Sequence, residues 1–365
     1  MKMHKDWSQP MLVSQRGQPV LRDGTLSKWR TLLQGALALI GLLALPALAQ
    51  PPWSQRVPRI STESLKPGDI VYSDSGDAIQ GGYILKLNPD TGEQTVISSG
   101  GLLKMPFGVA LDPGQQIVAS DSGRLIRINP ANGLQTMISD HSQGVLGYPY
   151  GLAFDRLGGI IVANGENVVS FDPVSGLAKV LSSGQHVLFP LGVAVSEKGD
   201  IFAAAYPSQI LRIHPKTGAQ VVVAEGGILN YPSLMAVRND DIYVTGVATP
   251  DGNFGIGKVV HVNAVTGETR LISESGYLMG PVGIALEQDG QILVADPYTI
   301  NPESPDLYDG GIMRINPVTG AQTLIARGYR NRVNPRGLTV VPGQREPQNR
   351  VREHPRAIPM FQKGQ

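Results

Sequence analysis

The chain has 365 residues, of which 41% are hydrophobic and 17% are charged, and its formal net charge is +1. A charge this close to neutral argues against a nucleic-acid-binding protein, because such proteins carry strongly basic surfaces. There is no cysteine, which excludes disulfides, thiolate catalysis, cysteine-ligated zinc and a lipid-anchor cysteine.

The amino-terminal segment has the parts of a secretory signal. Residues 31–45 are almost wholly apolar, follow a basic region and precede the small-x-small sequence Ala47-Leu-Ala49. We predict that residues 1–49 are cleaved before Gln50, which implies a periplasmic or secreted protein without a membrane span. The alternative is an uncleaved anchor, but the apolar run is shorter than the ~20 residues of a spanning helix. Residues 50–66 contain three prolines and read as a linker.

One turn motif then recurs six times, with successive glycines 41 to 53 residues apart. Asn or Asp opens a type I turn, Pro presets φ at the next position, and Gly supplies the positive φ that closes a hairpin. The copies are Asn88-Pro-Asp-Thr-Gly92, Asn129-Pro-Ala-Asn-Gly133, Asp172-Pro-Val-Ser-Gly176, His214-Pro-Lys-Thr-Gly218, Asn263-Ala-Val-Thr-Gly267 and Asn316-Pro-Val-Thr-Gly320.

A second motif, typified by Pro106-Phe-Gly-Val-Ala-Leu, keeps step with the first and recurs from Pro149, Pro190, Pro232, Pro281 and Pro335. Two more apolar segments separate the motifs and another follows the turn. Four short strands in about 42 residues are typical of a β-propeller blade. We call the strands of a repeat A, B, C and D.

The two ends of the array complement each other. The first repeat has strands B, C and D, at about 69–74, 83–88 and 93–98, whereas the last motif, at 335–341, is a strand A alone. We therefore predict an all-β, six-bladed propeller over 67–341. It has four-stranded antiparallel blades, and the C-terminal strand A joins the N-terminal blade and closes the ring. We expect a monomer.

The chain beyond the propeller, residues 342–365, contains five Lys or Arg and four Pro. It is predicted to be a disordered basic tail, because it has too little apolar content to form a core.

The patterns Pro-x-Gly-Val-Ala, Ile-x-Val-Ala-Asp and Arg-Ile-Asn-Pro-x-Thr-Gly resemble those of NHL-repeat and SMP-30/streptogramin-lyase-like six-bladed propellers, over about 66–341. The resemblance implies the fold, but the fold hosts enzymes, sensors and scaffolds. Enzymes of these families hold a divalent metal at the channel mouth through Asn, Asp and Glu. The matching positions here are Phe107, Tyr150, Leu191, Ser233, Val282 and Arg336. This ring is a poor cage for a hard cation, which weakens the prediction of a metal-dependent hydrolase or lyase.

The same six residues suggest another use. A mostly apolar ring with one guanidinium is suited to an apolar or anionic small molecule or to a peptide end. The alternative is that these side chains simply plug the channel, as interior positions of closed sheets do.

Strand direction places the A–B and C–D turns on one face and the B–C and D–A loops on the other. The B–C loops at 75–82, 247–257 and 297–310 are long, contain several acidic residues and no Lys or Arg, and belong to neighbouring blades. Asp306, Asp309, Tyr298 and Tyr308 lie in or beside the last loop. Oxygen-rich loops without Lys or Arg suit Ca²⁺ or another divalent cation, or a recognition patch for a cationic ligand, with Tyr298 and Tyr308 as candidate ligand-binding residues. The alternative is that Asp serves there as a turn former.

A second set of polar residues stands at the end of strand B: Asp74, Asp121, Asn164 and Asp296, with Ala205 and Gly246 in the other two repeats. Asp74 and Asp296, with Asp306 and Asp309, are the candidate metal ligands. The alternative is that short polar side chains accept backbone N–H bonds at a strand end.

Catalytic sequence motifs are scarce. His141 and His186 fall in D–A loops, where neither has an evident catalytic partner. The favoured prediction is a non-catalytic propeller outside the cytoplasm that binds a protein, glycan or small ligand on the long-loop face. The competing hypothesis is a metal-dependent hydrolase or lyase.

Overall fold

The structure is a computed structural model, and it describes residues 64–77, 81–247, 256–301, 304–327 and 334–343. The described residues all belong to one compact unit, Pro51–Gln365. The predicted signal, most of the linker and nearly all of the basic tail lie outside the described residues. Among the described residues the helical segment is the short η1 (His141–Gln143), and none of them forms a helix with the length and hydropathy needed to cross a membrane.

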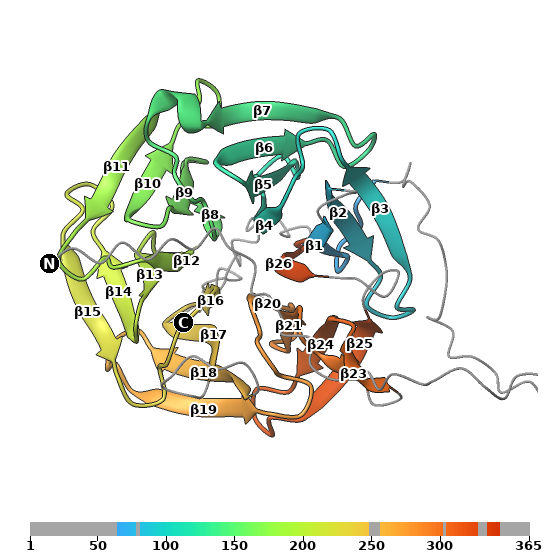
Figure 1. Ribbon diagram of the computed structural model, residues 1–365. Coiled ribbons are helices and arrows are strands. Elements are labelled where there is room, and N and C mark those ends of the chain that lie inside the picture. The colour runs from blue at the N-terminus through green and yellow to red at the C-terminus, as the bar shows by residue number, and fades with distance from the viewer. Residues whose placement is uncertain (1–63, 78–80, 248–255, 302–303, 328–333, 344–365) are drawn as a thin grey trace, which may run out of the picture. The chain divides into compact units, whose positions relative to one another are not determined.

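Six four-stranded antiparallel sheets surround a common centre as a six-bladed propeller (Figure 1), which confirms the predicted fold. Blade 1 has strands β26 (Pro335–Val340), β1 (Ile70–Asp77), β2 (Gly81–Leu87) and β3 (Gln94–Ser99), and blade 2 has β4 (Pro106–Leu111), β5 (Ile117–Asp121), β6 (Arg124–Ile128) and β7 (Gln135–Asp140). Blade 3 has β8 (Leu152–Phe154), β9 (Ile160–Ala163), β10 (Asn167–Phe171) and β11 (Ala178–Ser183), and blade 4 has β12 (Pro190–Val195), β13 (Ile201–Ala205), β14 (Gln209–Ile213) and β15 (Gln220–Glu225). Blade 5 has β16 (Met235–Arg238), β17 (Asp241–Val247), β18 (Gly257–Asn263) and β19 (Thr269–Glu274), and blade 6 has β20 (Gly283–Leu286), β21 (Ile292–Asp296), β24 (Gly311–Ile315) and β25 (Gln322–Arg327).

The last strand of the propeller closes the ring as predicted. Strand β26 pairs with β1 in antiparallel register, with Ile70 opposite Val340. The Gly337 N–H donates to Ser73 Oγ at 2.9 Å, and that hydroxyl donates in turn to the Phe107 carbonyl of blade 2 at 2.5 Å. Blade 1 is thereby joined both to the end of the described chain and to its next neighbour.

The inner strands approach one another too closely for side chains at one position. A Cβ on Gly283 would lie 2.1 Å from the Arg336 carbonyl oxygen, and one on Gly192 would lie 2.3 Å from that of Ser233. The glycine of the Pro-x-Gly motif is therefore required by packing between neighbouring blades. In blade 5 this position is Leu234, which is 8% exposed and belongs to one buried cluster with residues of blade 6.

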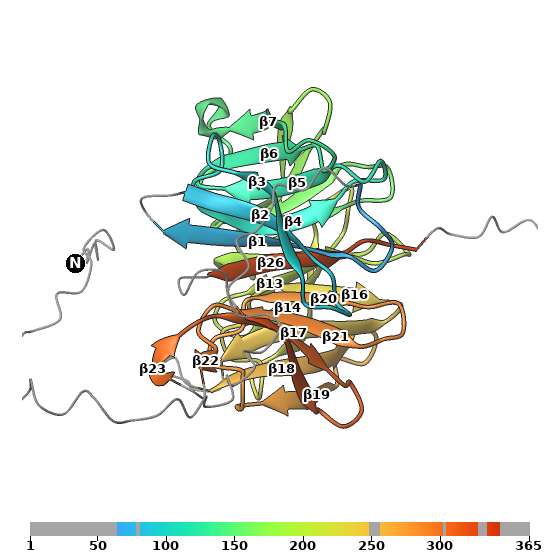
Figure 2. The ribbon, with the colours of Figure 1, turned by 90° about the vertical axis from the view of Figure 1, so that its right-hand side faces the viewer.

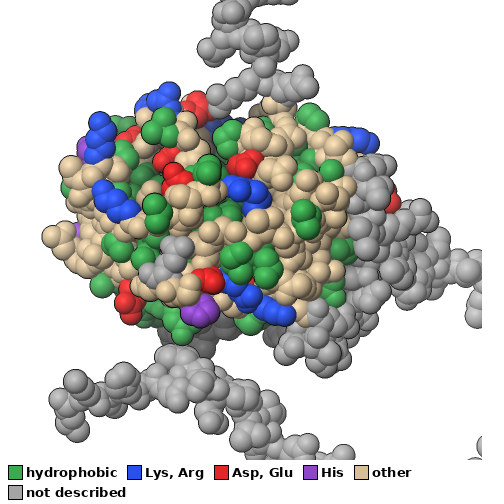
Figure 3. Space-filling view, turned by 90° about the horizontal axis from the view of Figure 1, so that it is seen from above, with side chains coloured by type: hydrophobic (Ala, Val, Ile, Leu, Met, Phe, Trp, Pro, Cys, Tyr) green, Lys and Arg blue, Asp and Glu red, His purple; other side chains and the backbone are tan. Residues whose placement is uncertain are grey.

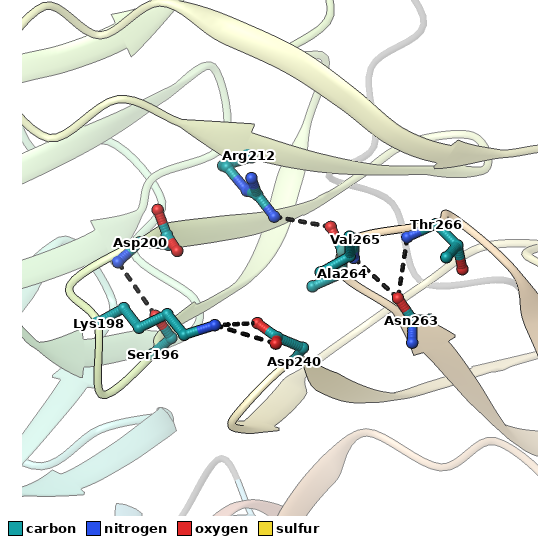
Figure 4. Close-up of polar contacts among 9 residues, drawn as sticks. All are labelled: Ser196, Lys198, Asp200, Arg212, Asp240, Asn263, Ala264, Val265 and Thr266. Carbon is teal, nitrogen blue, oxygen red and sulfur yellow. Dashed lines mark hydrogen bonds and ion pairs between the residues drawn. The ribbon is translucent and has the colours of Figure 1, made fainter.

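The face of A–B and C–D turns is occupied by contacts between blades (Figure 4). Arg212 on β14 donates to the Ala264 carbonyl in the C–D turn of blade 5 at 2.7 Å, and Lys198 forms an ion pair with Asp240 at 2.7 Å. Within that turn Asn263 Oδ1 accepts two backbone N–H bonds, as expected for the residue that opens the turn.

The rim is held by a repeated glutamine at the start of strand D. Gln220 Nε2 donates to Ser182 Oγ of the preceding blade at 2.9 Å, and Gln135 and Gln322 make the equivalent bonds to Ser98 and Ser273. In Figure 3, which views the ring from the β7 side, hydrophobic side chains are scattered among polar atoms and charges of both signs.

We expect Gln220→Ala to lower the free energy of unfolding by about 1 kcal/mol, because Gln220 also accepts the His186 N–H bond and its loss leaves those groups unpaired. Urea unfolding measures the change. Lys179→Ala, at an exposed position on β11, is the control; an equal loss in both variants would contradict this role of the glutamine.

Candidate functional site

Four side chains form a continuous row at the centre of the ring, on the face of the B–C and D–A loops. Arg336 Cζ lies 5.8 Å from the centroid of the Phe107 ring, and Phe107 meets Tyr150 edge to face at 5.1 Å. Tyr150 in turn contacts Phe189 at 5.8 Å between centroids. We call these four residues the mouth row. They come from four consecutive blades. Each stands at or just before the start of an inner strand.

Arg336 is the cation of the mouth row, and its side chain is partly buried. Among the described residues nothing accepts a hydrogen bond from its guanidinium or forms an ion pair with it, although it makes a cation–π contact with Phe107. Burial raises the pKa of two neighbouring carboxyl groups, Asp74 and Asp296, and the charge of Arg336 opposes part of that rise.

Apolar side chains fill the ring beside this row. Leu234 comes within 2.8 Å of the point where a Cβ on Gly151 would lie, although the two residues belong to blades 5 and 3. Val282 and Leu234 are 9% and 8% exposed, and Phe107 packs against their cluster. The remaining predicted ring positions are Leu191, which is partly buried, and Ser233, which is 9% exposed.

A set of large apolar residues, most of them exposed, lies on the same face and includes Phe189 of the mouth row. Met105, Tyr148 and Phe189 are 62%, 71% and 48% exposed, and each directly precedes the proline of an inner-strand motif. Tyr206, at the end of β13, is 46% exposed and contacts Tyr231 at 5.4 Å. We call these five residues the apolar arc; they lie on blades 2 to 5.

Sequence reasoning missed the apolar arc because it followed loop length, and the long loops belong to blades 5, 6 and 1. The available signal was the residue before the motif proline. It is Met105, Tyr148, Phe189 and Tyr231 in four successive repeats, but Gly280 and Asn334 in the other two. An aromatic or large apolar residue in four of six equivalent surface positions is more than turn geometry requires.

The polar residues at the end of strand B fasten the incoming loop to the blade. Asp296 Oδ2 accepts N–H bonds from Met279 and Gly280 at 2.7 and 3.0 Å, and Oδ1 accepts one from Tyr298 at 2.8 Å. Asp74 likewise accepts bonds from Gly76 and Asn334. The equivalent residues Asp121 and Asn164 also accept backbone N–H bonds, from Lys104 and Met105 and from Gly147 respectively.

Burial controls the ionisation of the two carboxyl groups nearest the centre. It raises the pKa of Asp74 and of Asp296 from 3.8 to about 6, because the charged form loses its hydration. The backbone N–H donors and the charge of Arg336 oppose this shift without cancelling it.

The acidic loop of blade 6 is a small hairpin, β22 (Ile300–Asn301) and β23 (Ser304–Tyr308), where an irregular loop was expected. It stands out from the face at which β1 ends (Figure 2). Asp309 is ion-paired with Arg327 at 3.6 Å. The side chains of Asp306 and Tyr308 lie outside the described part of the structure.

The described residues contain no group of three or more His, Asp or Glu side chains placed to hold a metal ion. The two loop histidines are exposed: His141 begins η1, and the backbone of His186 donates its N–H to Gln220 Oε1 and accepts the Leu188 N–H at its carbonyl. Within the described part of the chain, the histidine hydrogen-bonded to a carboxylate is His261, whose Nε2 lies 2.7 Å from Asp241 Oδ1; this pair stands on β18 and β17 and not in the mouth row.

Comparison with known proteins supports the fold alone. No family model and no curated protein matches the chain. Among 938 matching chains of solved structures, one from the crystal structure of a nidogen/laminin complex has a TM-score of 0.59 at 14% identity, covering 74% of this chain and 97% of that chain. The resemblance to NHL-repeat and SMP-30-like propellers therefore stands on the sequence motifs alone, and a fold this widespread does not indicate a function.

Proposed function

We propose that this protein is an exported, non-catalytic β-propeller that binds a protein partner through the apolar arc. The observation that carries the proposal is the exposure of Met105, Tyr148, Phe189 and Tyr206 on one face. Neighbouring exposed apolar side chains mark interaction sites on soluble proteins. Tyr, Phe and Met are also enriched at protein interfaces.

The two faces of the ring differ in a way that supports this assignment. On the turn face, Arg212 and Lys198 are engaged by the neighbouring blade. On the opposite face four residues of the arc are exposed to solvent: Met105, Tyr148, Phe189 and Tyr206. The structural neighbour from the nidogen/laminin complex is itself part of a protein assembly, which is in keeping with partner binding.

The proposal is tested by selecting random peptides displayed on phage against the immobilised, purified protein. We expect enriched peptides that lose binding to the double variant Tyr148→Ser and Phe189→Ser by about tenfold or more, because aromatic side chains dominate interface energetics. The control replaces Leu157 and Val174 with serine. These residues are 96% and 94% exposed, but they stand in turns on the opposite face. Enrichment that is equal on both variants would contradict the proposal.

Export is tested separately by determining the amino terminus of the mature protein. We expect it to begin at Gln50, because Ala47-Leu-Ala49 has the small residues that signal peptidase requires. A mature chain that retains residues 31–45 would contradict cleavage and favour a membrane-tethered protein.

The competing function, a metal-dependent hydrolase or lyase, requires several oxygen ligands around one ion. Asp74 and Asp296 instead accept backbone N–H bonds, and Asp309 pairs with Arg327. We expect the melting temperature to stay constant with EDTA and then with millimolar Ca²⁺, Mg²⁺ or Mn²⁺. A rise of several degrees with one ion would restore the metal-dependent hypothesis, because a ligand that binds the folded state stabilises it.

A further inference from the structure

We propose that Arg336 binds the carboxylate of a ligand whose apolar body lies against Tyr150 and Phe189. This inference rests on the proposed function, because it assigns a ligand chemistry to the centre of the same face. It adds a defined anchor to a surface that otherwise offers only apolar contact.

The guanidinium of Arg336 has hydrogen-bond donors that no described residue uses. Arginine carries five N–H donors in a planar fork, and Arg336 directs none of them to an acceptor among the described residues. The cation–π contact with Phe107, at 5.8 Å from Cζ to the ring centroid, uses none of these donors. A carboxylate matches this fork with two parallel hydrogen bonds, which are stronger and more directional than bonds to a neutral group.

Aromatic and apolar side chains lie beside the guanidinium of Arg336. The mouth row continues from Arg336 through Phe107 and Tyr150 to Phe189, which is 48% exposed. Leu234 and Val282 are buried beside it, so the ring is filled with apolar side chains at this level. A ligand held by Arg336 therefore meets aromatic surface next to its charged end, and an apolar or aromatic body suits that surface.

Two acidic side chains near Arg336 disfavour ligands that carry many negative charges. Asp74 on β1 and Asp296 on β21 lie near enough for Arg336 to act on both, and both are fixed by backbone N–H bonds. Their negative charges offset the long-range attraction of a single guanidinium. Recognition must then come from direct, short-range hydrogen bonding, which favours a single carboxylate over a chain of phosphates.

The test uses 3-phenylpropionate and its uncharged amide, which share shape and differ in the charged group. Isothermal titration calorimetry with the purified protein is expected to show millimolar binding of the acid and at least tenfold weaker binding of the amide. Arg336→Gln should remove this difference, whereas Arg124→Gln, at an arginine paired with Asp121 on the same face, should preserve it. Equal binding of acid and amide by the native protein, or an unchanged difference in Arg336→Gln, would overturn the inference.

Folding of the variants is checked by thermal melts. As a second readout, the Arg336 Nε–H resonance in ¹⁵N-arginine-labelled protein should shift with the acid and stay in place with the amide. A peptide chain end and a free organic acid share the proposed chemistry. Acetyl-Gly-Phe with a free carboxylate identifies the peptide end if it binds more tightly than 3-phenylpropionate and loses affinity on amidation.

The two proposals fail differently. Phage-selected peptides that bind Arg336→Gln as well as the native protein, but not the Tyr148 and Phe189 double variant, would support partner binding and overturn the carboxylate anchor. Acid binding that depends on Arg336, without any peptide enrichment, would support the anchor and contradict the partner proposal.

Discussion

Gly283→Ala is expected to lower the free energy of unfolding by about 3 kcal/mol or more, the upper range for overpacking a rigid core. The new Cβ would lie 2.1 Å from the Arg336 carbonyl oxygen and 3.0 Å from the Ala295 Cβ. The first of these atoms is backbone and the second is a short side chain, so neither can rotate out of the way. Relief requires blades 6 and 1 to separate where the ring closes.

The matched control is Gly147→Ala. Gly147 has no heavy atom within 4 Å of its ideal Cβ position, and it is absent from the residues with positive φ. This variant is expected to unfold at nearly the native urea midpoint, which equilibrium denaturation measures. A Gly283→Ala midpoint equal to that of the control would mean that the inner strands are not packed as tightly as described.

The second large effect is a stability that falls as pH rises. Burial raises the folded-state pKa of Asp74 and Asp296 to about 6, against 3.8 for the ordinary carboxyl. The folded state therefore binds these protons more tightly than the unfolded state does. Their contribution is fully present below about pH 4 and is lost as pH rises through about 6, at up to about 3 kcal/mol for each group.

Urea unfolding at several values between about pH 4.5 and 7.5 measures this dependence. Asp121 adds to the trend, because burial also raises its pKa. The exposed Asp140 and Asp172 have lowered pKa values and act in the opposite direction at the acidic end. Asp296→Asn should remove the share of Asp296 and flatten the profile. A stability that increases steadily from the acidic to the neutral end would contradict the assignment.

The fold could be predicted from sequence because its determinants are local and repeated. Each Asn-Pro-x-Thr-Gly turn requires the same backbone φ values, so similar residues recur at the same turn positions in all six repeats. Ring closure could be predicted by counting strands. The first repeat lacks a strand A and the last motif is a strand A alone, so pairing the two leaves no strand edge exposed. The hairpin β22–β23 escaped prediction because it occurs once and has no period to reveal it.

The site could be predicted only in part. The sequence motif places Arg336, Phe107 and Tyr150 at equivalent ring positions, and the structure shows contacts among them; their use in ligand binding stays a prediction. The sequence shows Leu234 as the exception at the glycine position of the Pro-x-Gly motif. That its side chain fills the ring beside Gly151 depends on distances across the ring, which the sequence does not give. The solvent exposure of Tyr148 and Phe189 likewise depends on how far each loop extends beyond the sheets. The amino-acid composition of a loop does not determine that distance.

The pairing of β26 with β1 has a kinetic consequence. Ser73 and Gly337, which are hydrogen-bonded in the closed ring, are 264 residues apart in the chain. During synthesis, β1 has an unpaired edge until almost the whole propeller has emerged. Contacts of such long range slow folding, because the entropy of loop closure is lost before the pairing is gained. The first blade is therefore the natural point for a chaperone to act on, and for aggregation to begin when none is present.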